Sequence, residues 1–171
     1  MSYIFISGGA SSGKSDFALK YLKGRSDVTF IATGVSTDSE MEMRIRRHKD
    51  QRPSAWTTIE EPVDLIKAFG NIKNRHAAII LDCLTFWVSN LIYSKKLERD
   101  KILELAEKTA HYLVTIEKTA LVVTNELGMG IIPENEEVRN YRKIAGEVNR
   151  IFARMSDEAY FIISGIGVKI K

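Results

Sequence analysis

The sequence predicts an α/β domain with a largely parallel sheet, because short apolar runs alternate along the chain with segments of helical spacing. A glycine-rich stretch, SGGASSGKSD, follows the first apolar run and leads into the first helical pattern. The chain has 171 residues, of which 44% are hydrophobic, so it is long enough to bury a core of its own. No linker or repeat interrupts it, and we expect a single domain over residues 1–171.

Five runs have the length and apolar composition of buried strands, at residues 3–7, 28–32, 77–82, 120–124 and 159–164. The C-terminal SGIGVKIK favours a β-turn and an edge strand over a ligand site.

Helical spacing predicts a helix after Lys14 and further helices at residues 40–49, 63–69, 84–93, 99–117 and 136–155. In the first helix one face carries Phe17, Ala18, Tyr21 and Leu22. The last helix has the clearest apolar stripe, which we expect to face the core and which consists of Val138, Tyr141, Ala145, Val148, Phe152 and Met155. The three prolines, Pro53, Pro62 and Pro133, fall in predicted connections.

Composition and charge limit the function classes. The net charge of +3 is too small to predict a nucleic-acid surface, whereas small anionic ligands fit it. The single cysteine, Cys83, excludes an intramolecular disulfide. We see no leader and no apolar run long enough to span a membrane, and therefore expect a cytoplasmic protein.

The glycine-rich stretch matches G-x-x-x-x-G-K-[ST] at Gly8, Gly13, Lys14 and Ser15, the pattern of a loop that binds nucleotide phosphates. Glycines let backbone N–H groups turn toward phosphate oxygens, and the helix that follows adds a partial positive charge. We expect Lys14 to reach the β- and γ-phosphates and the Ser15 hydroxyl to help hold Mg²⁺.

A second magnesium ligand is expected at the end of another buried strand. The run AAIILDC supplies Asp82 after five apolar residues. Taken alone, Asp82 fits equally well as the N-cap of the helix that begins near Leu84. Beside a phosphate loop, metal coordination is the better interpretation.

A basic segment surrounds His48 with Arg44, Arg46, Arg47, Lys49 and Arg52. Met41, Ile45 and His48 share one helical face, so a partly buried structural histidine is one interpretation. The other is a nucleophile, because an imidazole is largely neutral at pH 7 and neighbouring cations stabilise a triphosphate. His76 and His111 have no such neighbours and are expected at the surface.

Several segments together resemble the bifunctional adenosylcobinamide kinase/adenosylcobinamide-phosphate guanylyltransferase family. They are GGASSGKS, IATG, DSEMEMRIRRHKDQRP, Trp56 followed by Glu60, LDCLTFWVSN, VVTNELGMGIIPENEEVRNYR and SGIGVKIK. The likeness spans Ser7 to Lys171, and the His48 segment and TNELGMGIIPE are more specific than the phosphate loop. It implies a RecA-like P-loop NTPase fold and a homotrimer that assembles the nucleotide loop of adenosylcobalamin.

The resemblance implies two activities. One phosphorylates the aminopropanol hydroxyl of adenosylcobinamide with ATP or GTP, with Lys14 as a catalytic residue and Ser15 and Asp82 as Mg²⁺ ligands. The other transfers GMP from GTP to adenosylcobinamide phosphate, giving adenosylcobinamide-GDP and pyrophosphate, and His48 matches the histidine that carries GMP. Nucleotide contacts carry over to Gly8, Gly9, Ala10, Ser11, Ser12, Gly13, Lys14, Ser15, Ala32, Thr33, Gly34, Lys49, Asp50, Gln51, Arg52, Glu60 and Asp82.

The chain departs from its relatives at two of these positions. Many carry Arg where this chain has Ser11, which removes a cation near the phosphates and bears on the efficiency of the kinase step. Some carry Glu where this chain has Asp82, so the shorter side chain shifts the metal position.

The stretch NELGMGIIPE has two interpretations. It is expected either to contact substrate at the sheet edge or to turn the chain into the last helix, with Met129 and Ile131 packed beneath it. For the whole protein, the alternatives are a P-loop small-molecule kinase without guanylyl transfer and a nucleotide-dependent switch. The switch is disfavoured because the sequence contains no N-K-x-D motif.

Overall fold

The computed structural model describes residues 3–36, 38–72, 78–116 and 118–171. Within these residues, seven strands form one sheet in the order β3-β2-β4-β5-β1-β6-β7. All neighbouring pairs are parallel except β6 and β7, which are antiparallel. The strands are β1 (Ile4–Gly8), β2 (Val28–Ala32), β3 (Thr57–Glu60), β4 (Ala78–Asp82), β5 (Ala120–Val123), β6 (Glu158–Ile163) and β7 (Ile166–Lys169).

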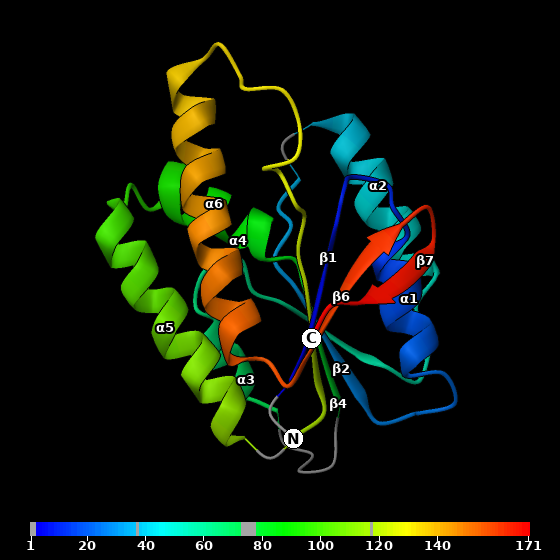
Figure 1. Ribbon diagram of the computed structural model, residues 1–171. Helices are drawn as coiled ribbons and strands as arrows, with labels where there is room; N and C mark the ends of the chain where they lie inside the picture. The colour runs from blue at the N-terminus through cyan, green and yellow to red at the C-terminus, as the bar shows by residue number, and fades with distance from the viewer. Residues whose placement is uncertain (1–2, 37, 73–77, 117) are drawn as a thin grey trace.

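Helices connect the parallel strands, as the alternating sequence pattern predicts. They are α1 (Lys14–Tyr21), α2 (Ser39–Asp50), α3 (Leu65–Gly70), α4 (Leu84–Ser89), α5 (Arg99–Thr115) and α6 (Glu136–Met155), with a π-helical turn, η1 (Asn90–Ser94), directly after α4. Figure 1 shows α3 to α6 on one side of the sheet and α1 and α2 on the other.

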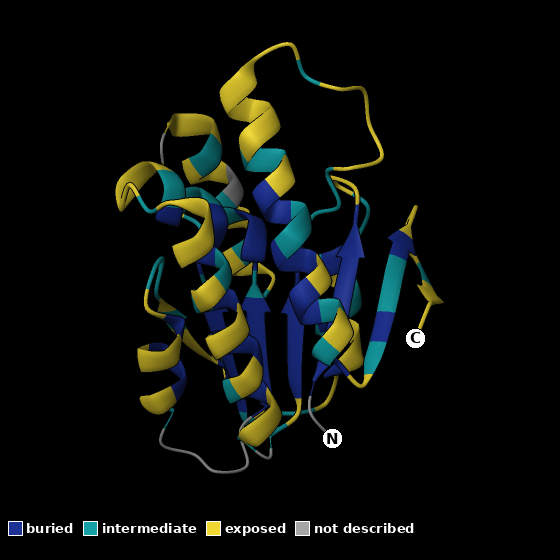
Figure 2. Cartoon of the chain, turned by 60° about the vertical axis from the view of Figure 1, so that its left-hand side comes forward, coloured by how far each residue is buried: buried dark blue, intermediate teal, exposed yellow. Residues whose placement is uncertain are grey.

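Two apolar layers hold the helices against the sheet. One joins α3, α4, α5 and α6 to side chains such as Phe5, Leu81 and Val122. The other joins α1 to the opposite face through Ala18 and Leu22. Strands that are buried on both faces read as continuous apolar runs, which is why the central ones are recognisable in the sequence. Figure 2 shows the buried sheet and the exposed outer surfaces of the helices.

Two residues that were predicted to lie on the apolar face of a helix are exposed, one at the start of α6 and one at the end of α1. Val138 is 44% exposed because the first turns of α6 extend past the sheet, whereas Ala145, Val148 and Phe152 farther along are buried. Tyr21, in the last turn of α1, is also exposed, while Ala18 and Leu22 pack on the sheet.

Strand β3 is absent from the sequence-based expectations, whereas β7 is present as the predicted edge strand. Both lie at edges of the sheet. In β3 only Ile59 is half-buried and its neighbours are exposed, so no apolar run marks it. The prediction at residue 77 and at His76 falls outside the described residues.

The carboxyl ends of the parallel strands meet at one edge of the sheet, at the top of Figure 1. The glycine-rich loop follows β1 there, and α2 and the loop before α6 lie at the same edge. Strand β5 separates β1 from β4, so the ends of these two strands have one strand between them. Ligands of open α/β sheets bind at this edge.

Candidate active site

The glycine-rich loop is shaped by backbone conformations that require glycine. Gly13 has φ +93° and directly precedes α1 without a side-chain cap, so the first N–H groups of the helix face the loop. At Gly8 a Cβ atom would lie 2.6 Å from the carbonyl oxygen of Ile162 on the neighbouring strand. The loop thus has the backbone geometry of an anion-binding site at a helix N-terminus.

Lys14 opens α1 and is only 7% exposed. Its ammonium donates a hydrogen bond of 2.5 Å to the carbonyl oxygen of Gly9, across the loop. A lysine folded over the loop in this way keeps its positive charge beside the backbone N–H groups at the start of α1.

The next residue joins the loop to β4. The Ser15 hydroxyl donates a hydrogen bond of 2.8 Å to Asp82 Oδ2. One hydroxyl and one carboxylate at this separation are hard oxygen donors of the kind that Mg²⁺ takes from a protein, with phosphates and water completing the shell. Over the described residues, no group of three or more His, Cys, Asp or Glu side chains could hold a metal ion.

Thr33 ties the ends of β2 and β4 together. Its hydroxyl donates to the carbonyl oxygen of Cys83 at 2.7 Å and accepts from the Cys83 N–H at 2.8 Å, and the side chain is fully buried. Burial, together with the nearby Asp82 carboxylate, raises the pKa of the neighbouring Cys83 thiol to about 11. Thr33 thus braces the site, whereas Ala32 and Gly34 on either side of it face the cavity.

Helix α2 brings His48 to the same site. Its N-cap, Asp38, accepts a 2.8 Å hydrogen bond from the Met41 N–H, which fixes the start of the helix. The spacing then places Met41, Ile45 and His48 on one half-buried face, as predicted, and this face lines a cavity of about 530 Å³. Lys14, Ser15 and Asp82 line the same cavity.

Arg52 lies between β2 and β3 at the wall of this cavity. Its guanidinium carbon is 3.7 Å from the centre of the Phe30 ring, and its Nη1 donates to the Thr58 hydroxyl at 3.2 Å. Burial lowers the pKa of Arg52, while the carboxylates of Asp82 and Glu60 oppose that shift. Within the part of the chain that the structure describes, its Nε is the one buried side-chain N or O atom without a hydrogen-bond partner. An N–H left in this state is suited to an acceptor on a ligand.

The predicted nucleotide-binding residues divide into three groups. Those that line the 530 Å³ cavity are residues 11–15, Ala32, Gly34, Gln51, Arg52 and Asp82. Lys49 and Glu60 form an ion pair and line a neighbouring cavity of about 440 Å³, which shares Arg52 with the first. Gly8, Gly9, Ala10, Thr33 and Asp50 line neither cavity.

Several residues of the cavity were not predicted from the sequence. Phe30, Met43 and Phe86 contribute to its wall, together with Asn125, the first residue of the NELGMGIIPE stretch that was expected at the sheet edge. Asn125 follows β5, the strand between β1 and β4, and its side chain donates to the Thr85 hydroxyl at 3.1 Å. Its position after β5, between the ends of β1 and β4, agrees with the expectation that this stretch begins at the sheet edge.

The loop before α6 stands out from the molecule. Met129 is 79% and Ile131 95% exposed, so the interpretation that packed them beneath the chain is wrong. Arg142 holds the loop by donating to the carbonyl oxygens of Ile131 at 2.8 Å and Gly128 at 2.5 Å. Contact of this loop with substrate stays a prediction.

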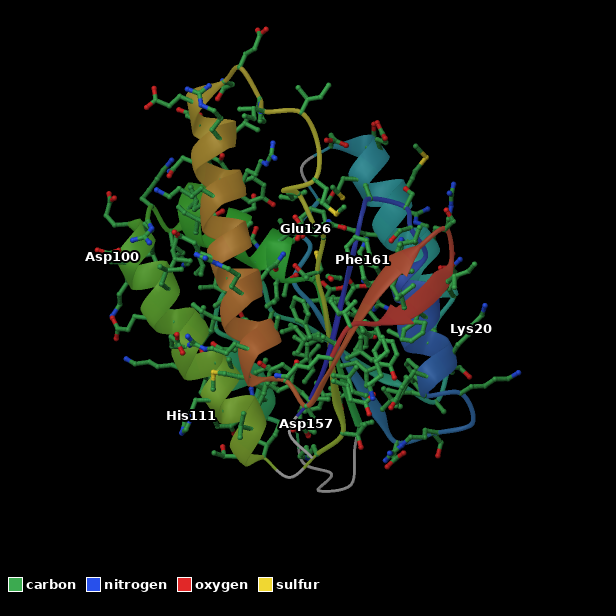
Figure 3. The ribbon with its side chains drawn as sticks, in the orientation of Figure 1. Lys20, Asp100, His111, Glu126, Asp157 and Phe161 are labelled. Carbon is green, nitrogen blue, oxygen red and sulfur yellow. The ribbon has the colours of Figure 1, made fainter. Side chains whose placement is uncertain are left out.

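His111 is exposed on α5, as predicted, and points away from the sheet in Figure 3. Glu126, by contrast, follows β5 at the site edge, and its backbone N–H donates to the Gly8 carbonyl oxygen at 2.9 Å. None of the helices in the described ranges is long and apolar enough to cross a membrane.

Comparison with known proteins gives a family and close relatives. Residues 4–170 match the model of a family described as cobinamide kinase / cobinamide phosphate guanyltransferase. The chain is 36% identical to the bifunctional adenosylcobalamin biosynthesis protein CobU of Escherichia coli K12, over 98% of this chain and 99% of that protein. It is 38% identical to the CobU protein of Salmonella typhimurium, with the same coverage of both chains, and 33% identical to the CobP protein of Pseudomonas aeruginosa, over 97% and 95%.

Solved structures with low sequence identity share the fold. A Pyrococcus horikoshii protein aligns with a TM-score of 0.60 at 9% identity, over 99% of this chain and 86% of its own. A KaiC-like protein of the same organism aligns with a TM-score of 0.54 at 13% identity, over 94% and 70%. An ATPase of a bacterial type III secretion system aligns at 0.55 and 13%, over 98% and 56%. These neighbours and the mostly parallel sheet confirm the predicted RecA-like P-loop fold.

Proposed function

The chain belongs to the cobinamide kinase / cobinamide phosphate guanyltransferase family, and from this premise we propose that both reactions use the cavity shared by Lys14 and His48. Membership makes it an enzyme of adenosylcobalamin biosynthesis with a kinase and a guanylyltransferase activity. The proposal concerns which residues act, through which intermediate, and in what assembly. Its support is one observation: His48 and Lys14, which come from different elements, line the same cavity.

In the kinase step, the aminopropanol hydroxyl of adenosylcobinamide attacks the γ-phosphorus of ATP or GTP. A new phosphorus–oxygen bond forms, the bond to the bridging oxygen breaks, and the nucleoside diphosphate leaves with that electron pair while the hydroxyl proton is released. Lys14 neutralises charge on the β- and γ-phosphates, and the N–H groups at the start of α1 hold them in place. The reaction requires positioning more than covalent help from the protein.

Ser15 and Asp82 are the residues that would hold Mg²⁺. Their two oxygen atoms already lie 2.8 Å apart at the mouth of the phosphate loop, a donor set that fits this ion. When bound, Mg²⁺ supplies charge neutralisation for the phosphate oxygens.

In the guanylyl step, a ring nitrogen of His48 attacks the α-phosphorus of GTP. A phosphorus–nitrogen bond forms, the bond to the α,β-bridging oxygen breaks, and pyrophosphate leaves with the electron pair. A phosphate oxygen of adenosylcobinamide phosphate then attacks the same phosphorus, and the imidazole leaves with the electrons of the phosphorus–nitrogen bond. Arg47 and Arg52 in the cavity wall are available to neutralise the phosphates during both displacements.

The experiment that tests this proposal is incubation with GTP labelled at the α-phosphorus. Label should remain on the denatured protein, survive alkali and be lost in mild acid, which is the behaviour of a phosphoramidate. The same incubation with adenosylcobinamide and Mg²⁺ should yield adenosylcobinamide-GDP by mass spectrometry. Phosphorylated corrinoid without protein-bound label would instead support a small-molecule kinase that lacks guanylyl transfer.

The assembly and the location are part of the same proposal. We take residues 1–171 as one catalytic domain and the working form as a cytoplasmic homotrimer. Sedimentation equilibrium tests the assembly directly, because a trimer of 19.3 kDa chains has three times the mass of a monomer. A monomer that retains full activity would contradict it.

A further inference from the structure

The C-terminal hairpin lies directly against the phosphate loop. Strand β6 pairs with β1, and Ile162 is the register partner of Gly8, the first glycine of the loop. The hairpin then turns through Ser164 and Gly165 before β7 begins. Both turn residues have positive φ angles, +50° and +81°, as a two-residue type I′ turn requires. The turn is therefore placed at the end of β1 by the sheet itself.

Two contacts join this turn to the loop. The Gly165 N–H donates a hydrogen bond of 2.8 Å to the carbonyl oxygen of Ser12. A Cβ atom at Gly13 would lie 3.1 Å from the Cα atom of Gly165, so the backbones are already in close contact. Farther along the hairpin, a Cβ atom at Gly167 would collide with the ring of Phe17 on α1. The hairpin thus contacts both the loop and the helix that follows it.

The Ser12 carbonyl and the Gly13 N–H belong to one peptide unit. In a planar trans peptide these two groups point in opposite directions. Since the Ser12 carbonyl points to the Gly165 amide of the hairpin, the Gly13 N–H is directed away from the hairpin. Gly13 lines the cavity, whereas Ser164 and Gly165 do not. The side of the loop away from the hairpin is therefore the side on which phosphate is expected.

We propose that the Ser164–Gly165 turn is a positioning element for nucleotide binding, in which the Gly165 amide orients the Ser12–Gly13 peptide so that its N–H faces the phosphates. This inference rests on the proposed nucleotide site. Neither residue touches the nucleotide in this scheme; the turn acts through the loop. The loop is held at its other end by the Glu126 N–H, which donates to the Gly8 carbonyl oxygen.

The test compares Gly165→Ala with Gly24→Ala. Both glycines have positive φ angles, +81° and +88°, and an added Cβ would meet no atom within 4 Å at either site, so the strain introduced is the same. Gly24 lies in the connection between α1 and β2, at the opposite edge of the sheet from the loop. Alanine at Gly165 relieves its strain by relaxing the turn, which withdraws the amide from Ser12.

We expect Gly165→Ala to weaken binding of a fluorescent GTP analogue roughly 5- to 30-fold. Gly24→Ala should bind as the wild type does, while both variants lose a similar few degrees of melting temperature. Gly165→Asn should recover wild-type affinity, because Asn tolerates positive φ and keeps the N–H. Unchanged affinity in Gly165→Ala, or an equal loss in Gly24→Ala or Gly165→Asn, would overturn the inference. Failure of the wild type to bind GTP would instead refute the proposed function.

Discussion

The Ser15 hydroxyl and the Asp82 carboxylate, 67 positions apart in the chain, are joined by a 2.8 Å hydrogen bond. This bond connects the first turn of α1 to the end of β4 across the intervening strand β5. We propose a functional explanation for the approach of these two groups, which is a shared cation.

Replacement of Asp82 by Asn tests that explanation. The substitution keeps the size of the side chain and its ability to bond Ser15, but removes the negative charge that attracts Mg²⁺. We expect kinase turnover to fall about 100-fold or more and to need higher MgCl₂ for half-maximal rate. Initial rates across a magnesium titration measure both effects. Asp100→Asn, at an exposed position on α5, is the matched control, and an equal loss there would refute the metal role.

Replacement of His48 by Ala should separate the two activities. Without the imidazole no GMP adduct can form, so guanylyl transfer should fall by at least about 1000-fold. Kinase turnover should stay within about threefold of the wild type, because the phosphate loop is unchanged. Corrinoid products resolved by chromatography report both steps in one assay. His111→Ala, on the outer side of α5, should change neither, and a parallel loss of both activities in His48→Ala would show a structural histidine.

Replacement of Arg52 by Lys tests whether its buried N–H serves a ligand. Lysine keeps the positive charge but loses the guanidinium plane over Phe30 and the Nε–H that lacks an acceptor. We expect the KM for GTP to rise about 10-fold, the equivalent of one charge-assisted hydrogen bond. Steady-state kinetics at saturating corrinoid measure this value. Arg46→Lys is the control on the neighbouring helix, where the side chain is exposed.

Replacement of Glu147 by Gln tests an ion pair between α5 and α6 and gives a pH-dependent stability difference. Arg99 Nε and Nη2 donate to the two oxygens of Glu147 at 2.8 and 2.9 Å, and this hydrogen bonding lowers the pKa of Glu147. A carboxylate whose pKa is lowered by folding stabilises the folded state at pH values above the ordinary pKa of Glu. That contribution is lost as the pH falls through the pKa of Glu147 in the folded state.

Urea unfolding of the wild type and Glu147→Gln at pH 7 and at pH 3 should therefore show a lower midpoint for the variant at pH 7 and a smaller difference at pH 3. The effect should be modest because the Arg99 side chain is partly solvated. Glu134→Gln, in the exposed loop before α6, should show no difference at either pH. A difference that persists unchanged at pH 3 would contradict the ion-pair explanation.

Much of the fold could be predicted because the central strands are buried on both faces. The runs that form β1, β2 and β4 are continuous and apolar, and their ends carry the phosphate loop and Asp82. Strand β3 could not be predicted, because an edge strand with exposed neighbours needs no apolar run and obtains its register from β2. Its last residue, Glu60, pairs in register with Ala32 at the site edge.

Site residues could be predicted where one contiguous motif contains several of them. They could not be predicted where the fold brings together residues that are far apart in the chain. The phosphate loop is contiguous, so its residues 11–15 follow from a single pattern. Phe86 reaches the cavity because α4 begins at the end of β4, and Asn125 because β5 ends between β4 and β1, a relation that depends on strand order. The Lys49–Glu60 ion pair likewise depends on β3, because Glu60 is the last residue of that strand. Both residues line the neighbouring cavity.

The cavity of about 530 Å³ that Lys14 and His48 both line has a consequence for turnover. If one compartment serves both reactions, the nucleoside diphosphate left by phosphorylation must depart before the next GTP can react with the imidazole. The enzyme would then alternate between phosphorylation and guanylyl transfer. The nucleoside diphosphate from the first reaction would slow the second for as long as it occupied the cavity. A nucleoside diphosphate that accumulates would in that case compete with GTP for the cavity and slow completion of the corrinoid.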